Sequence, residues 1–161
     1  MHNKPDNYWL NIDGKARVQN LQVPVLLMAG WYDPFLPTQL QDFELIMQYT
    51  DSKVANSSQL IIGSWTHADS VKFPDDATAG DYRPASLEPS IDWFDRHLMG
   101  KHNGTAKTPV KLFVMGENKW RDEQEWPLAR TQYQSYYLHS GGNANTLNGD
   151  GRLNTTLSAE H

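Results

Sequence analysis

Two residues that could act as an acid and a base each follow an apolar run that ends in glycine. Asp33 lies three residues after Gly30, and His67 lies four residues after Gly63. A carboxylate that accepts a hydrogen bond from Nδ1 of a histidine fixes the tautomer of the ring and stabilises the imidazolium, which suits nucleophilic catalysis. An aspartate after a strand is also commonly a turn former or a helix cap. A single histidine is commonly structural, so the spacing by itself leaves both interpretations open.

The apolar runs before these residues predict two parallel strands. Residues 21–30, LQVPVLLMAG, lack polar alternation, as expected of a strand that helices cover on both faces. Residues 59–63 form a second and shorter apolar run. A helical pattern lies between them, and this order defines a β-α-β unit with parallel strands. Since such strands lie about 4.8 Å apart and sites form beyond their carboxyl ends, the segments that follow them can bring Asp33 and His67 together.

Two amphipathic helices are predicted around these strands. The first runs from Thr38 to about Tyr49, because Thr38-Gln-Leu-Gln41 has the form of a capping box and apolar residues follow at helical spacing (Leu40, Phe43, Ile46 and Met47). The second covers residues 86–99, with Gly100 as its stop signal. Its apolar face carries Ile91, Phe94 and Leu98. The pattern therefore indicates an α/β protein.

The remaining segments indicate a change of architecture near Arg130. Residues 66–84 form a long polar stretch without periodicity, and residues 109–116 form a third continuous apolar strand. Residues 131–140 alternate like a half-exposed antiparallel strand, and turn-forming residues follow. The domain prediction is thus α/β for residues 1–130 and the opening of an incomplete β domain for residues 131–161. Three parallel strands would also leave a sheet edge unpaired, which favours a partner or a longer parent protein.

Composition excludes several function classes. The chain has 161 residues, a formal net charge of −5, 20% charged residues and no cysteine. The sequence has no basic stripe of the kind that binds nucleic acid and no polybasic patch of the kind that binds a membrane. Neither is therefore expected as a partner. Without cysteine, disulfides, thiolate catalysis and cysteine-ligated zinc are excluded within these residues. No apolar signal core or membrane-length stretch occurs, so a soluble protein of undetermined compartment is expected, with no cofactor indicated.

Five blocks resemble the cocaine-esterase and X-Pro dipeptidyl-peptidase-like (CocE/NonD) hydrolases, which include glutaryl acylase-like members. The blocks are VPVLLMAGWYDPF, LIIGSWTHADS, WFDRHLMG, PVKLFVMGENKWRDEQEWPLART and YYLHSGGNANTLNGDGRL. They occur in order from about Tyr8 onward. The resemblance implies a serine hydrolase with an α/β-hydrolase domain, a helical cap and a C-terminal jelly roll. The expected fold is therefore a partial α/β-hydrolase fold followed by the first strands of a jelly-roll domain.

The resemblance also implies roles for individual residues. Asp33 matches the acid of the catalytic triad and His67 matches the base. Phe35 matches the aromatic residue that lines the acyl pocket. Three further aromatics are expected to pack around the dyad: Trp31, Tyr32 and Trp65. The related α-amino-acid ester hydrolases carry acidic residues just after the triad aspartate, whereas Pro34, Phe35 and Leu36 stand here, which favours an uncharged acyl group.

The nucleophile of that family has no counterpart in these residues. No Gly-x-Ser-x-Gly pentapeptide occurs, and Ser64 precedes Trp-Thr-His instead of opening a helix. We therefore expect part of a serine hydrolase for ester or amide substrates that supplies the acid and the base and is inactive alone. The alternative is a truncated or split-gene product that acts as an assembling half or a non-catalytic binding module. The expected partners are the substrate and either the missing N-terminal half or a second copy.

Other candidate sites rank below the dyad. A metal site at His67, Asp69, Asp75 and Asp76 has no strong ligand spacing, and a solvated loop is the favoured interpretation. His97 is expected at the surface and His102 in a linker. Trp120 and Trp126 suggest sugar stacking, but the resemblance assigns them to packing between the two domains.

Overall fold

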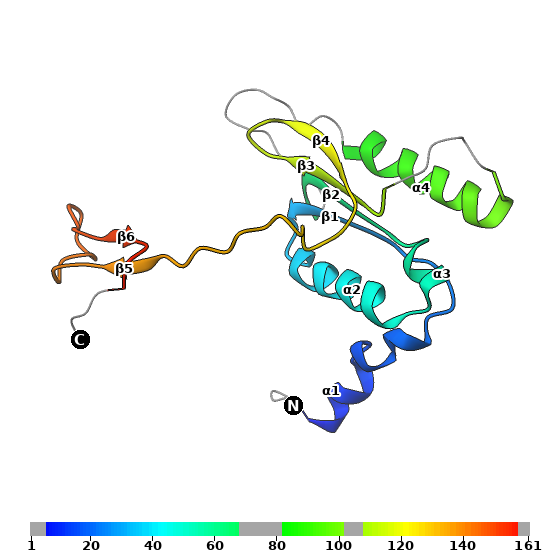
Figure 1. The fold of residues 1–161 in the computed structure, drawn as a ribbon, viewed down its shortest axis with the longest axis horizontal. Coiled ribbons are helices and arrows are strands. Elements are labelled where there is room, and N and C mark those ends of the chain that lie inside the picture. The colour runs from blue at the N-terminus through cyan, green and yellow to red at the C-terminus, as the bar shows by residue number, and fades with distance from the viewer. Residues whose placement is uncertain (1–5, 68–81, 102–107, 158–161) are drawn as a thin grey trace. The chain divides into compact units, whose positions relative to one another are not determined.

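The computed structural model describes residues 6–67, 82–101 and 108–157. The chain divides into two compact units, Met1–Ala129 and Arg130–His161. The first unit contains the four-stranded sheet and the helices, and the second contains a small two-stranded sheet (Figure 1). Within the described ranges, no helix combines the length and apolar character needed to cross a membrane.

The sheet of the first unit has the strand order β1-β2-β3-β4. Strands β1 (Leu26–Tyr32), β2 (Gln59–Thr66) and β3 (Val110–Val114) are parallel to one another. Strand β2 is buried along nearly its whole length, as expected of a central strand covered on both faces. The three parallel strands that the apolar runs predict are therefore present.

Strand β4 (Lys119–Glu123) is a feature that the sequence analysis missed. It pairs antiparallel with β3, from Val110 opposite Glu123 to Val114 opposite Lys119. Four of its five residues are charged and all but Glu123 are exposed, so no apolar alternation marks it. Strand β4 thus covers the edge of β3, whereas β1 remains an edge strand among the described residues, so the predicted unpaired edge is present at β1.

Helix α2 (Leu36–Tyr49) begins two residues before the predicted position. Phe35 is its N-cap and makes no side-chain capping bond, and Pro37 stands in the first turn, where its missing N–H costs nothing. The expected capping box at Thr38 is wrong, because Thr38 already lies inside the helix. Phe43 and Ile46 are buried residues of this helix, and Phe43 belongs to the apolar core of the unit.

Helix α4 (Tyr82–Met99) covers part of the other side of the sheet (Figure 1). It begins four residues earlier than predicted and ends where predicted, with Gly100 at a φ of 65° that favours glycine. Shorter elements complete the unit: α1 (Asn7–Ile12), the 3₁₀-helix η1 (Lys15–Asn20) and α3 (Ser52–Ala55). Asp6 caps α1 and Asp51 caps α3 through side-chain hydrogen bonds.

One apolar core holds the first unit together. It joins helix α2 to the three parallel strands through buried side chains: Ala29, Leu36, Phe43, Leu60, Ile62, Val110 and Leu112. Trp31, Trp126 and Leu128 pack against this cluster while remaining partly exposed. The core therefore fixes the parallel strands that lead to Asp33 and His67.

The second unit contains β5 (Tyr137–His139) and β6 (Arg152–Asn154). They pair antiparallel, with Leu138 opposite Leu153. The predicted strand over residues 131–140 is therefore strand only at 137–139. Both central leucines are more than half exposed, so this unit buries little apolar surface among the described residues.

Candidate active site

Asp33 and His67 directly follow the ends of two neighbouring parallel strands. Strand β1 runs through Tyr32 and strand β2 runs through Thr66, so each strand continues past the glycine that ends its apolar run. Parallel strands present their carboxyl ends at one edge of the sheet, which is where sites form in open α/β folds. The two side chains consequently emerge from the same edge.

The two strands change register just before they end. Gly30 pairs with Gly63, but Tyr32 pairs with Thr66, so β2 advances by one more residue than β1. Such a bulge bends the strand and re-aims the side chains that follow it. Here it precedes His67 by only one residue, and it therefore sets the direction in which the imidazole emerges.

Trp65 occupies the space that the paired glycines leave open. A Cβ on Gly30 would lie 1.8 Å from the Trp65 carbonyl oxygen, and a Cβ on Gly63 would lie 1.8 Å from Cζ3 of the indole. Trp65 is only 8% exposed and also contacts the ring of Trp120, with 6.0 Å between the centroids. Both glycines are therefore required by close approach of this tryptophan. The sequence shows a glycine at the end of each apolar run. It does not show that Trp65 is the residue that requires both glycines.

Nδ1 of His67 lies 3.2 Å from Oδ2 of Asp33. The two side chains differ in exposure, at 64% for His67 and 8% for Asp33. The other carboxylate oxygen, Oδ1, accepts a hydrogen bond of 2.8 Å from the Phe35 amide. The Asp33 amide in turn donates to the Gly30 carbonyl at 3.0 Å. The carboxylate is thus held from both sides and shielded, whereas the imidazole is open to solvent.

The aromatic residues near the dyad have different surroundings. The Phe35 ring contacts the His67 ring edge to face, with 5.0 Å between the centroids, and is 56% exposed. Trp31 donates a 2.6 Å hydrogen bond from Nε1 to the Phe113 carbonyl, which ties β1 to β3. Tyr32 is 50% exposed at the end of β1. The structure thus brings the Phe35 ring into contact with the histidine.

Trp120 and Trp126 are engaged by other aromatic rings. Trp120 contacts Phe113 in addition to Trp65, with 5.5 Å between the Trp120 and Phe113 centroids. Trp126 lies 6.5 Å from Trp31, measured between ring centroids. Their described contacts are therefore packing contacts across the sheet of the first unit.

The remaining candidates do not form a second centre among the described residues. Ser64 is 5% exposed within β2, which leaves its hydroxyl out of reach of a substrate. In the described part of the chain, no three potential ligands gather to hold a metal ion. The suggested ligands Asp69, Asp75 and Asp76 lie outside the described residues, as does His102. His97 lies on α4 and is partly buried against Trp93, so its expected surface position is wrong in part.

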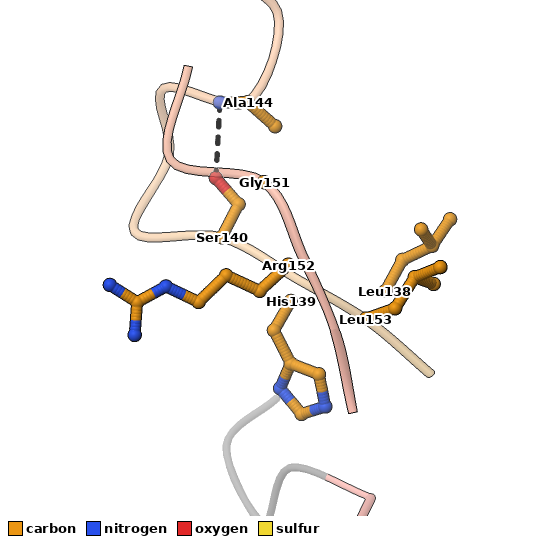
Figure 2. A pocket seen from close by; sticks show the side chains of 7 residues that line it. All are labelled: Leu138, His139, Ser140, Ala144, Gly151, Arg152 and Leu153. Atoms are coloured by element: carbon orange, nitrogen blue, oxygen red, sulfur yellow. Dashed lines mark hydrogen bonds between the residues drawn. The ribbon is translucent and has the colours of Figure 1, made fainter. Parts of the chain in front are cut away.

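A cavity of about 530 Å³ in the second unit is lined by His139 and Ser140, and Asp150 lies beside Ser140, but these three residues do not form a triad. Ser140 Oγ donates to Asp150 Oδ1 at 2.6 Å, and His139 Nε2 lies 2.9 Å from the Thr156 carbonyl oxygen. Figure 2 shows Ser140 directed toward Ala144 and the His139 ring directed away from it. Hydrogen bonding from Ser140 is the main reason that the pKa of Asp150 lies below its usual value. These groups hold the turn between β5 and β6.

The parallel sheet, its covering helices and an Asp–His pair at the carboxyl edge define an α/β-hydrolase type of protein. Residues 1–69 match the model of the X-Pro dipeptidyl-peptidase (S15) family. Residues 103–161 match the model of the X-Pro dipeptidyl-peptidase C-terminal non-catalytic domain. The chain belongs to the CocE/NonD family of hydrolases.

Individual relatives agree with this family. The chain is 36% identical to the cocaine esterase of a Rhodococcus species over 98% of its own length. It is similar to the crystal structure of an aminopeptidase from a marine sediment Thaumarchaeota archaeon, with a TM-score of 0.65 and 19% identity over 86% of the chain. A CocE/NonD family hydrolase from Staphylococcus aureus gives a TM-score of 0.58 and 18% identity over 83%. The chain spans 27% of the esterase and 23% and 22% of the two structures.

Proposed function

We propose that these residues supply the acid and the base of a serine hydrolase that cleaves ester or amide bonds through an acyl-enzyme. Asp33 is the acid and His67 is the base. The observation that carries the proposal is the 3.2 Å approach of Oδ2 to Nδ1 beyond the carboxyl ends of adjacent parallel strands. Membership of a hydrolase family supports the same chemistry.

The unequal exposure of the pair suits these roles. Asp33 is shielded and anchored by the Phe35 amide, so it can hold the imidazole in the tautomer that carries its proton on Nδ1. Nε2 is then free to accept a proton from a serine hydroxyl. Because His67 is exposed, a serine carried by a neighbouring segment can reach it.

The reaction follows from these positions. As the serine oxygen bonds to the substrate carbonyl carbon, its proton passes to Nε2 of His67, and Asp33 stabilises the imidazolium. The same proton then moves to the leaving alcohol or amine while the acyl–heteroatom bond breaks, which leaves an ester on the serine. A water molecule repeats the sequence, giving its proton to His67, and releases a carboxylic acid and the free serine.

The substrate is proposed to carry an uncharged acyl group. Pro34, Phe35 and Leu36 follow the aspartate and present no carboxylate to a substrate amine. Phe35 is more than half exposed and its ring lies beside His67, so it is placed to contact an acyl group that has entered the site. An apolar acyl chain gains most from such a contact.

The nucleophile is proposed to come from a polypeptide segment outside these 161 residues, since they contain no Gly-x-Ser-x-Gly elbow. The chain alone should then be inactive, and it would act as an assembling half. The specific observation in favour of assembly is an exposed apolar stripe on α4, formed by Leu87, Ile91, Phe94 and Leu98. Exposed apolar stripes of this kind are typical of interaction surfaces.

An ester assay tests both parts of the proposal. The purified chain is assayed with p-nitrophenyl butyrate alone and after mixing with the elbow-bearing segment of a family member. We expect turnover only in the mixture, and we expect His67→Ala to abolish it. His139→Ala is the matched control, because this histidine lies in the other unit and bonds a backbone carbonyl.

Three results would contradict the proposal in different ways. Turnover by the chain alone that His67→Ala abolishes would show that the nucleophile lies within these residues. Turnover in the mixture that survives His67→Ala would remove the histidine from the mechanism. A stable complex between the two segments without any turnover would favour the alternative function, a non-catalytic binding module.

A further inference from the structure

Trp31 stands where β1 stops following β2. Gly30 still pairs with Gly63, and the next pair is Tyr32 with Thr66, so Trp31 has no partner residue in the register. Its indole is partly buried against the apolar core that joins helix α2 to the parallel strands. Trp31 therefore belongs to the packing behind the dyad rather than to the surface that faces a substrate.

The Trp31 indole donates to a carbonyl that the pairing of β2 with β3 leaves unused. The Pro109 carbonyl accepts from the Leu60 amide, and backbone groups along a strand alternate in direction, so the Phe113 carbonyl also faces β2. The pairing of β2 with β3 ends one position before Phe113. Nε1 of Trp31 donates to the Phe113 carbonyl at 2.6 Å. A side chain of β1 thus replaces a backbone donor of β2 and joins two strands that are not neighbours.

Asp33 is the last residue of a turn that contains Trp31. The Asp33 amide donates to the Gly30 carbonyl at 3.0 Å, so Trp31 and Tyr32 are the two central residues of this turn. The Tyr32 side chain is 50% exposed, whereas the Trp31 indole is packed and hydrogen-bonded. Holding the indole therefore fixes the direction in which Asp33 leaves the strand.

The other hydrogen bonds of Asp33 are local. Its Oδ1 accepts from the Phe35 amide at 2.8 Å, and its carbonyl accepts from the Leu36 amide at 3.1 Å. These two bonds fix Asp33 against the start of α2. They do not fix it across the sheet toward His67, which follows β2. The bond from Trp31 to β3 supplies a link in that direction.

We propose that Trp31 is a positioning residue for the acid: its indole N–H, bonded to the Phe113 carbonyl, holds the turn so that the Asp33 carboxylate faces His67. The proposal rests on the proposed function, in which Asp33 keeps the proton of the neutral imidazole on Nδ1. The hydrogen bond that one ring nitrogen makes decides which nitrogen carries the proton. Without the anchor, the 3.2 Å approach of Oδ2 to Nδ1 is no longer enforced, and the proton moves to Nε2 in part of the molecules.

The test reads the tautomer of His67 in the full 161-residue chain by ¹⁵N NMR in alkaline solution, where histidines are neutral. The His67 signals are assigned by their loss in His67→Ala. In the main variant, benzothienylalanine replaces the tryptophan at position 31, which keeps the shape of the indole and puts a sulfur in place of its N–H. Trp31→Phe is the second variant, and circular dichroism checks that both are folded.

Trp93→Phe is the matched control. Trp93 is 9% exposed, and its Nε1 has no hydrogen-bond partner among the described residues. The control therefore removes a buried indole without removing a hydrogen bond.

We expect the proton on Nδ1 in the unmodified chain and in the control, and at least a tenfold lower ratio of the Nδ1 to the Nε2 tautomer in both position-31 variants. In the mixture with the elbow-bearing segment, the benzothienylalanine protein should lose at least tenfold in kcat with KM unchanged, because only the orientation of the base is altered. A tautomer change without turnover in any mixture would support the positioning role and count against assembly alone.

Three results would overturn the positioning role. An unchanged tautomer in the benzothienylalanine protein would show that the indole N–H does not orient Asp33. An equal change in Trp93→Phe would show that the loss of any buried indole has this effect. A proton on Nε2 in the unmodified chain would remove the Asp33–His67 pair and the proposed function with it.

Discussion

At the residue scale, the acid and base roles proposed for Asp33 and His67 are consistent with their environments. The Asp33 carboxylate is 8% exposed, and its Oδ1 accepts a hydrogen bond from the Phe35 amide. Its position therefore does not depend on the histidine. The imidazole is 64% exposed and contacts Phe35 on one side. A rigid acceptor that orients a more accessible base is the arrangement that general-base catalysis requires.

This arrangement predicts the effect of Asp33→Asn in the assembled hydrolase. The amide cannot hold His67 in the required tautomer, so kcat should fall about 10⁴-fold while KM changes little. Steady-state kinetics with p-nitrophenyl butyrate measures both constants. Asp95→Asn is the control, because this carboxylate pairs with Lys101 at the surface and should be neutral. A kcat within tenfold of the wild type for Asp33→Asn would exclude the proposed role.

At the element scale, the decisive feature is the place where β1 and β2 change register. The glycine pair lets Trp65 pack across the strand ends, and the extra residue in β2 turns His67 toward Asp33. The hydrogen bond from Trp31 to the Phe113 carbonyl ties the end of β1 to β3. The geometry of the dyad thus depends on packing behind it as well as on the two residues themselves.

Gly63→Ala should therefore destabilise the first unit. The new methyl group would meet the Trp65 indole at 1.8 Å, and relieving that clash should cost about 1–3 kcal/mol of unfolding free energy. Urea denaturation followed by tryptophan fluorescence measures the loss. Gly14→Ala is the matched control, since its Cβ meets nothing within 4 Å, and it should change stability by less than about 0.5 kcal/mol. Equal stability of the two variants would show that Trp65 does not require the glycine.

At the scale of the whole molecule, each unit leaves apolar surface exposed. The stripe on α4 reaches 76% exposure at Leu98, and in the second unit Leu138 is 87% exposed. The curated and solved relatives are several times longer than this chain, which spans 27% of the Rhodococcus esterase. Surfaces of this kind favour association with another polypeptide.

The stripe predicts concentration-dependent association of the isolated chain. Leu98→Glu should weaken it, because a charge would have to be buried in the contact. Met99→Glu should not, since this neighbouring side chain is 64% exposed and lies outside the stripe formed by positions 87, 91, 94 and 98. Sedimentation velocity over a range of concentrations compares the three proteins. Identical behaviour of both variants would exclude α4 as the contact surface.

The sequence by itself determined the local elements and the residues that carry the proposed chemistry. Continuous apolar runs marked the three parallel strands, because a strand covered on both faces has no polar side. Helical periodicity marked α2 and α4, and Gly100 marked a helix end. The positions of Asp33 and His67 after such runs made their meeting possible, since parallel strands end at one edge, and the family resemblance was needed to favour it over a turn aspartate and a structural histidine.

Only the tertiary structure decided features that depend on distant residues. Strand β4 is polar and exists because it pairs with β3, so its own sequence does not mark it. The start of α2 at Leu36 depends on the turn at Asp33 rather than on the local signal at Thr38. The packing of Trp65 into the space beside Gly30 and Gly63 likewise required the strands to be placed side by side. Periodicity is a local property, whereas pairing and close packing depend on which surfaces the folded chain brings together.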